Sequence, residues 1–275
     1  MNVLSLEQLN FFKAKGYLHI EGMLSDEEIS KVDQDSLEMI EPNLWGPCDD
    51  DRWLYNKTTD NREILRRIDG LDCTDMPQSF QVLLGNPKLL WAVDQLMEGD
   101  FFAASVQALV YKAAKYGLPL HWHQDPINVR RFPAFNMDIY LDQATVENGC
   151  VYVIPESHLA GYHAKDPGFI EQWTDGKGIE AEKAVPVETN RGDVIFHATS
   201  VLHASGENKT SSSRRTIYYH FDRYDDVKLA KLSGEEWPYW RSEFPEAQKI
   251  MENAIKLRSE AFPLETPFPY KFIQK

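Results

Sequence analysis

Cysteine is scarce in this sequence, and its few cysteines form no recognisable pattern. Cys48, Cys73 and Cys150 are the three cysteines among 275 residues, and no two of them have C-x-x-C spacing. The sequence therefore predicts neither a disulfide framework nor a zinc knuckle, and buried free thiols are the simplest interpretation.

Long apolar runs are also missing. The sequence contains no stretch of about 18 apolar residues, the length that a membrane-spanning helix needs. Its first residues lack the basic and apolar regions of an export signal. We therefore expect a cytoplasmic protein without a membrane partner.

Basic residues are the third shortage. The chain has 29 Lys and Arg against 43 Asp and Glu, which gives a formal net charge of −14. Such a charge repels phosphate backbones and anionic surfaces, so nucleic acid is not an expected partner. The hydrophobic content of 43% is nevertheless that of a packed protein, and we expect one domain over residues 1–275.

The pattern of the chain changes near residue 100. Before it, Ser5 with Gln8 and Ser25 with Glu28 fit capping boxes that begin helices. A short strand is predicted at 16–20, and residues 42–100 look like short helices and loops. A β-rich core is predicted over about 101–222, and a C-terminal helical part over about 223–275, with a helix at 246–261.

The predicted core consists of short β-type runs bounded by turn residues. Their succession favours a mainly β fold with flanking α-helices, a sandwich or jelly roll, over a βαβ fold. In the second run apolar residues alternate with Asn136, Asp138 and Tyr140, so one face can pack on helices while the other lines a cavity. The runs are 101–111, 134–141, 150–154, 193–198 and 215–221.

The strongest functional signal is His123-Gln124-Asp125. Residues two apart on a strand point to the same side, so His123 and Asp125 can bind one ion together. A match to H-x-D or H-x-E arises by chance about once in a chain of this composition, so a further ligand is required. His203 supplies it, and Arg214 follows eleven residues later. Two histidines and one carboxylate leave positions on Fe(II) for a 2-oxo acid and dioxygen, and the arginine fork suits a far carboxylate.

Four segments resemble the phytanoyl-CoA dioxygenase family of Fe(II)- and 2-oxoglutarate-dependent oxygenases. Together they span most of the chain, from about residue 5 to 222, and the last three, in that order, are specific. Glu156 departs from the family, which usually has Gly at that position. The segments are 8–29, His123 to Asp125, 147–158 with its Asn148-Gly149 and Ser157-His158, and His203 to Arg214.

The resemblance implies a double-stranded β-helix, a cupin-like jelly roll, with helices packed on one sheet. It also implies that His123, Asp125 and His203 bind iron and that Arg214, with Ser205 beside it, binds the 5-carboxylate of 2-oxoglutarate. His121 falls where some relatives carry Gln near the co-substrate. We expect it to form a hydrogen bond there or to solvent, not to bind the metal.

The expected reaction is oxidative decarboxylation of 2-oxoglutarate to succinate and CO2, coupled to hydroxylation of a small organic metabolite such as a natural product or an amino-acid-like compound. Fe(II), 2-oxoglutarate and O2 are the expected cofactors, with ascorbate as reductant in an assay. Desaturation or cyclisation needs the same residues, and a non-catalytic jelly-roll binding protein is a further alternative. An acyl-CoA substrate is disfavoured by the charge and by the lack of a basic cluster apart from Arg130-Arg131.

Asp138, with Asn136 on the same strand face, is the predicted substrate contact. The family alignment places a large apolar residue or Trp at position 138 in many relatives. A carboxylate in a cavity needs a cation or several donors. We expect it to receive an amine or hydroxyl of the substrate, or else to pair with Arg130 or Arg131 or reach solvent.

Several other residues have open or structural interpretations. His197 is expected to be a core residue. Whether His220 approaches the cavity is left open by the sequence. Arg215 competes with Arg214 for the carboxylate. A structural or surface role is expected for His158 and His163, and packing or a lid for Trp237, Tyr239 and Trp240.

Overall fold

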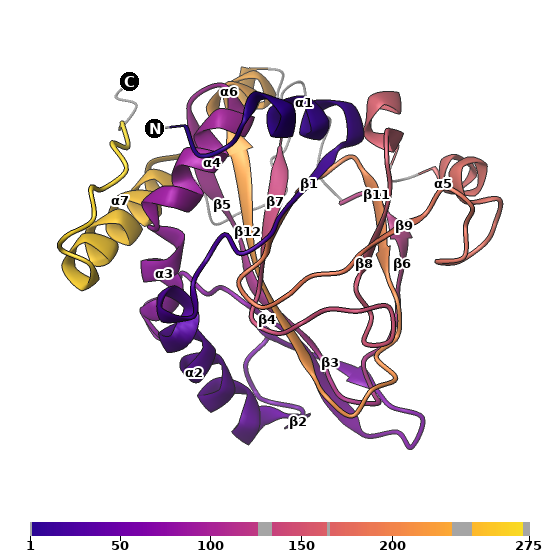
Figure 1. Ribbon diagram of the computed structural model, residues 1–275. Helices are drawn as coiled ribbons and strands as arrows, with labels where there is room; N and C mark the ends of the chain where they lie inside the picture. The colour runs from indigo at the N-terminus through magenta and orange to yellow at the C-terminus, as the bar shows by residue number, and fades with distance from the viewer. Residues whose placement is uncertain (1, 126–133, 164–165, 233–243, 272–275) are drawn as a thin grey trace.

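Two antiparallel sheets facing each other form the centre of the molecule in a computed structural model, which describes residues 2–125, 134–163, 166–232 and 244–271 (Figure 1). The small sheet has the order β6 (Leu120–His123), β11 (Leu202–Ser205), β8 (Val151–Ile154) and β9 (Val185–Val187). The large sheet has the order β1 (Tyr17–Ile20), β10 (Val194–Ala198), β7 (Phe135–Tyr140), β12 (Arg214–Arg223), β5 (Phe101–Lys112), β4 (Glu63–Asp69) and β2 (Trp45–Gly46), with β3 (Trp53–Lys57) paired to β4. The predicted jelly roll is confirmed.

Helices cover the outer face of the large sheet, as Figure 1 shows. Both predicted capping boxes are present, with Ser5 and Ser25 as the N-cap residues. None of the described helices is both long and apolar enough to cross a membrane. The covering helices are α1 (Leu6–Lys15), α2 (Asp26–Asn43), α3 (Ser79–Leu84), α4 (Pro87–Met97) and α7 (Phe244–Ala261). The others are η1 (Ser157–Ala160), α5 (Pro167–Thr174) and α6 (Tyr224–Leu232).

Alternation along β7 separates the core from the interior of the jelly roll. Phe135, Met137 and Ile139 belong to the apolar core shared with the helices, whereas Tyr140 belongs to a second cluster between the two sheets. Adjacent side chains of a strand point to opposite faces, so Asn136 and Asp138 share the inner face with Tyr140. The predicted division of this strand into a helix-facing side and an inner side is confirmed.

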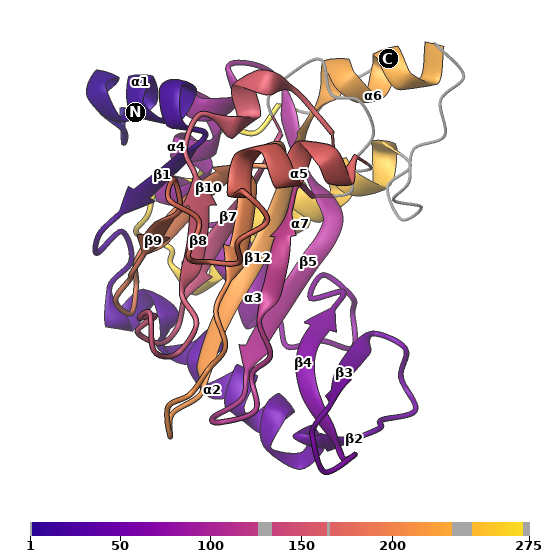
Figure 2. The same cartoon turned by 90° about the vertical axis from the view of Figure 1, so that its right-hand side faces the viewer.

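The first hundred residues contain more sheet than predicted. Strands β3 and β4 form a hairpin that joins β5 and projects past the rest of the large sheet (Figure 2). Residues 63–69 read Glu-Ile-Leu-Arg-Arg-Ile-Asp, a mixture of charged and apolar residues without strict alternation. Its strand conformation depends on pairing with β5, which local periodicity does not reveal.

Candidate metal centre

His123, Asp125 and His203 lie together at one end of the small sheet. Strands β6 and β11 are neighbours, and His203 pairs directly with His123. Asp125 Oδ1 lies 4.0 Å from His123 Nε2 and 3.7 Å from His203 Nε2. One ligand atom from each of the three residues falls within 4.8 Å of the others. The structure thus brings the three predicted ligands into one cluster of the size that a metal ion requires.

Both imidazoles present Nε2 to this cluster. His123 Nδ1 lies 2.8 Å from the backbone oxygen of His121, and His203 Nδ1 lies 3.0 Å from that of Val201. A carbonyl oxygen only accepts, so each Nδ1 is the donor of this hydrogen bond and Nε2 is the nitrogen left to bind a metal. Burial, together with the charge of His123, lowers the pKa of His203 to about 3. His203 is therefore a neutral ligand at ordinary pH.

The side-chain amide of Asn136 holds the carboxylate of Asp125. Asn136 donates from Nδ2 to Asp125 Oδ2 at 2.9 Å, and the backbone N–H of Asp125 donates to the oxygen of Thr199. Burial acts to raise the pKa of Asp125, but the imidazoles of His203 and His197 outweigh it and hold that pKa well below its usual range. The carboxylate is therefore anionic, and Oδ1 remains directed to the two histidines.

Asn136 is the middle member of a polar row across three strands. It pairs with His197 of β10 on one side and with His220 of β12 on the other. His220 Nδ1 lies 2.7 Å from Asn136 Oδ1, and His197 Nε2 lies 3.1 Å from Asn136 Nδ2. His220 Nε2 is also 3.2 Å from Asp222 Oδ1. The row thus leaves His220 buried in a hydrogen-bonded position, and it fixes which way the Asn136 amide faces.

Asp138 is fully buried beside this row. Its Oδ2 lies 3.0 Å from His197 Nδ1, and both side chains have no exposed surface. Burial acts to lower the pKa of His197, but Asp138 and Asp125 outweigh it and raise that pKa to about 10. His197 is therefore the cation that accompanies Asp138. The alternative that Asp138 reaches solvent is wrong, and Arg130 and Arg131 lie outside the described residues.

Arg214 and Arg215 point to opposite faces of β12. Arg215 lies on the helix side, where its Nη2 is 2.7 Å from both Asp33 Oδ1 and Asp142 Oδ1. Arg214 lies on the inner side with 1% of its surface exposed, and its Nη1 donates to Thr216 Oγ1 at 3.3 Å. Arg214 is therefore the arginine that the structure places between the sheets.

The remaining predicted co-substrate residues lie near the cluster. Ser205 is buried on β11, two positions after His203 and on the same strand face. His121 is exposed, and its carbonyl orients His123 as described above.

The two histidines predicted to be structural or surface residues are not members of the metal cluster. His158 donates a hydrogen bond from Nε2 to the backbone oxygen of Lys13, and His163 donates one from Nε2 to that of Ala160. Trp237, Tyr239 and Trp240 lie outside the described residues.

Glu156, where the family usually has Gly, occupies the left-handed region with φ 72°. That conformation favours Gly, which explains the family preference. Here Glu156 forms an ion pair with Lys15.

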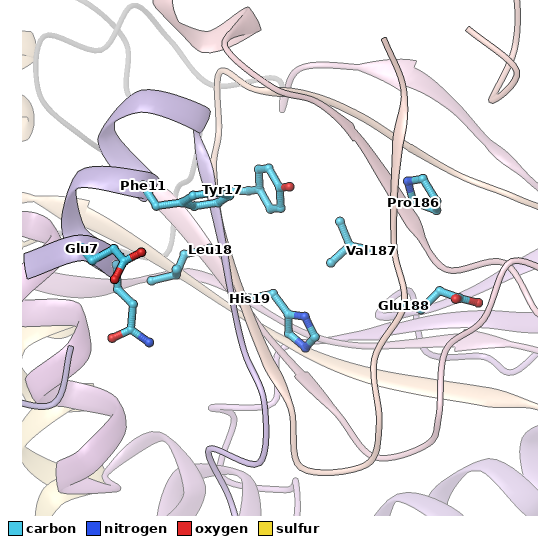
Figure 3. A pocket seen from close by; sticks show the side chains of 9 residues that line it. Glu7, Phe11, Tyr17, Leu18, His19, Pro186, Val187 and Glu188 are labelled. Carbon is cyan, nitrogen blue, oxygen red and sulfur yellow. The ribbon is translucent and has the colours of Figure 1, made fainter. Parts of the chain in front are cut away.

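A separate groove of about 400 Å³ opens between α1, β1 and β9. Figure 3 shows Tyr17 and His19 of β1 on one side and, on the other, Val187 of β9 with Glu188, the residue after that strand. None of the predicted site residues lines this groove, so it is distinct from the metal centre.

A family model described as phytanoyl-CoA dioxygenase (PhyH) matches residues 12–216. Dioxygenase lolE1 of Epichloe uncinata is 25% identical over 227 residues, which cover 80% of this chain and 84% of that protein. Methylphosphonate hydroxylase of Gimesia maris is 25% identical over 232 residues, which cover 78% and 79%. The crystal structure of EctD from S. alaskensis with 2-oxoglutarate and 5-hydroxyectoine matches with a TM-score of 0.66 at 20% identity, over 82% of this chain and 79% of that one.

Proposed function

The chain belongs to the phytanoyl-CoA dioxygenase family, and we propose that it uses Fe(II), 2-oxoglutarate and dioxygen to hydroxylate a small organic metabolite. The observation that carries this proposal is the cluster of His123, Asp125 and His203, whose ligand atoms lie within 4.8 Å of one another. Together with 2-oxoglutarate and dioxygen, iron supplies an oxidant strong enough to attack a C–H bond.

The donor set fits iron better than a closed structural zinc site. Structural zinc sites use four protein ligands, whereas this cluster offers three among the described residues. Two neutral imidazoles and one carboxylate leave positions for a bidentate 2-oxo acid and for dioxygen. Asn136 holds Asp125 Oδ2, so that Oδ1 is the oxygen offered to the metal. Outer partners of this kind orient ligands and are important for metal affinity.

The far end of the co-substrate is assigned to Arg214. A buried guanidinium needs an anionic partner, and Arg214 Nε has no hydrogen-bond partner among the described residues. Its fork can bind a carboxylate through two parallel hydrogen bonds. Ser205, two positions after His203, is assigned to the same carboxylate.

The proposed substrate is a small metabolite, in keeping with the names of methylphosphonate hydroxylase and of EctD with 5-hydroxyectoine. Asn136 and Asp138 were the predicted substrate contacts, but their polar atoms face Asp125, His220 and His197. We therefore assign these two residues to support of the metal centre. The substrate contacts themselves stay unassigned.

The decisive experiment is succinate release from 2-oxoglutarate by the protein with Fe(II), ascorbate and a panel of small metabolites. Release above that of the Asp125→Ala variant supports an oxygenase. Binding of 2-oxoglutarate without any succinate release favours the non-catalytic binding protein. The product mass separates the outcomes: hydroxylation adds one oxygen atom, whereas desaturation or ring formation removes two hydrogen atoms.

A further inference from the structure

The groove between α1, β1 and β9 runs over the free edge of β1. This strand ends the large sheet, and among the described strands only β10 pairs with it. Residues from both faces of β1 line the groove: Leu18 belongs to the core shared with the helices, whereas Tyr17 packs against the cluster between the sheets. Figure 3 shows Leu18 on one side of the strand and Tyr17 and His19 on the other. A groove that touches both faces of a strand lies over its edge.

Two residues of β1 point their backbone groups to this free edge. Gly16 accepts a hydrogen bond from the N–H of Ala198, one position outside the paired residues of β1 and β10. In an antiparallel pair, residues that bond to the partner strand alternate with residues that do not. Leu18 therefore bonds to β10, as Gly16 does, while the N–H and C=O groups of Tyr17 and His19 point away from β10. A further strand would bond to these groups.

The groove is apolar beside the strand and acidic at its rim. The rings of Phe11 and Tyr17 meet edge to face with their centroids 5.4 Å apart, and the buried Val187 lies across the groove from Tyr17 (Figure 3). Glu7 of α1 and Glu188, which follows β9, are both exposed. Among the described residues that line the groove there is no lysine or arginine. The groove therefore favours a ligand that is basic and partly apolar.

The two carboxylates flank β1 from opposite sides, as Figure 3 shows. Successive side chains of a strand point to opposite faces, so a strand paired with β1 would direct one side chain towards Glu7 and the next towards Glu188. Lysine and arginine suit both positions, because their charge meets a carboxylate while their aliphatic stem packs on the rings. The charge of Lys15 acts on Tyr17, but Lys15 forms an ion pair with Glu156 and does not line the groove.

We propose that this groove binds an extended peptide with two adjacent basic residues, which adds a strand to the free edge of β1. Main-chain hydrogen bonds to Tyr17 and His19 supply affinity, and Glu7 and Glu188 select the basic side chains. A second copy of this chain is a poor occupant, since its net charge of −14 opposes self-association. None of the metal-site residues lines the groove, so the inference goes beyond the proposed function and does not depend on it.

The test uses the blocked peptide acetyl-Thr-Val-Lys-Lys-Val-Thr-amide and NMR of the isotope-labelled, full-length protein. In the free protein the amide protons of Tyr17 and His19 should exchange with solvent faster than that of Leu18, which bonds to β10. Saturating peptide should slow the exchange of the first two and shift their resonances. Fluorescence anisotropy of the labelled peptide gives the Kd.

Matched peptides and variants separate the main-chain contribution from the charge contribution. N-methylation of both lysine amides keeps the charge and removes the donors, so the Kd should rise about tenfold, as for loss of two backbone hydrogen bonds. Glu7→Gln and Glu188→Gln should each raise the Kd about two- to fivefold, as for an exposed ion pair. Glu171→Gln, on an exposed glutamate of α5 outside the groove, should leave it unchanged. A peptide with Glu in place of both lysines should not bind.

Several results would overturn the inference. Unchanged resonances of Tyr17 and His19 at millimolar peptide would show that the edge takes no strand. Equal binding of the N-methylated peptide, or of spermidine, would show a simple cation site instead. A dimer in light scattering, with both amides already protected, would assign the edge to a second copy of the chain. Succinate release tests the proposed function separately and is unaffected by any of these results.

Discussion

Asn136 donates a hydrogen bond to Asp125 Oδ2 at 2.9 Å, so a neutral amide on the large sheet holds the carboxylate that faces two histidines of the small sheet. The same amide accepts from His220 and lies against His197. The position of the carboxylate thus depends on the register of three strands.

We expect Asn136→Ala to weaken metal binding by about tenfold or more, the lower end of the range for outer partners of metal ligands. The physical reason is that Asp125 Oδ2 loses its donor and the carboxylate is free to turn. Calorimetric titration with Mn(II) or Co(II) measures the effect. Asn136→Gln keeps an amide with a longer reach and should recover part of the affinity. Wild-type affinity in Asn136→Ala would show that Asp125 needs no such support.

The sequence was sufficient to predict the cluster itself. His123 and Asp125 are two apart on a strand, so local geometry places them on one side. His203 and Arg214 were found from spacing and from resemblance to a family. The structure places the first three together and Arg214 between the sheets.

The polar row behind the cluster was not predictable in the same way. His197, Asn136 and His220 are distant in the sequence and become neighbours through the pairing of β10, β7 and β12. Cross-strand register is a long-range property, and a shift by one residue would turn every one of these side chains to the other face.

Alanine at His123, Asp125 or His203 should abolish turnover while leaving the fold intact. Each substitution removes one of three protein ligands of the metal. None of the three residues belongs to the large apolar core, so the metal-free protein should still fold. Succinate release gives the activity, and thermal melting of the metal-free protein checks the fold. His163→Ala, on a histidine outside the cluster, is the control. Full activity in any of the three variants would contradict the site.

Arg214→Ala should weaken co-substrate binding, whereas Arg215→Ala should lower the stability of the fold. Loss of Arg214 removes the charge expected to bind the far carboxylate, so the Kd of 2-oxoglutarate should rise tenfold or more; a hydrogen bond to a charged group contributes about 1.5–3 kcal/mol. Loss of Arg215 instead breaks its ion pairs with Asp33 and Asp142, so the melting temperature should fall. Calorimetry and thermal melting on both variants separate the roles. A larger change in Kd for Arg215→Ala would reverse the assignment.

Lys112 predicts a dependence of stability on pH. It is 6% exposed on β5, and its Nζ donates to the backbone oxygens of Leu118 and Gly206. Burial, and after it the charge of Arg214, lowers the pKa of Lys112 to about 7. The unfolded value is about 10.4. Between these two values the unfolded chain binds more protons than the folded one, so this group makes the free energy of unfolding rise with pH.

Chemical denaturation at pH 7, 8 and 9 tests this dependence by comparing the unmodified protein with Lys112→Met. The variant loses two hydrogen bonds at every pH, so it should be less stable throughout, and the gap should widen as pH rises. One lysine contributes at most about 1.4 kcal/mol per pH unit, the free energy of one pKa unit. Lys115→Met, on an exposed lysine three residues along, should show a constant difference from the unmodified protein. A gap for Lys112→Met that stays constant from pH 7 to 9 would mean that Lys112 remains charged in the folded protein, held by its two carbonyl acceptors.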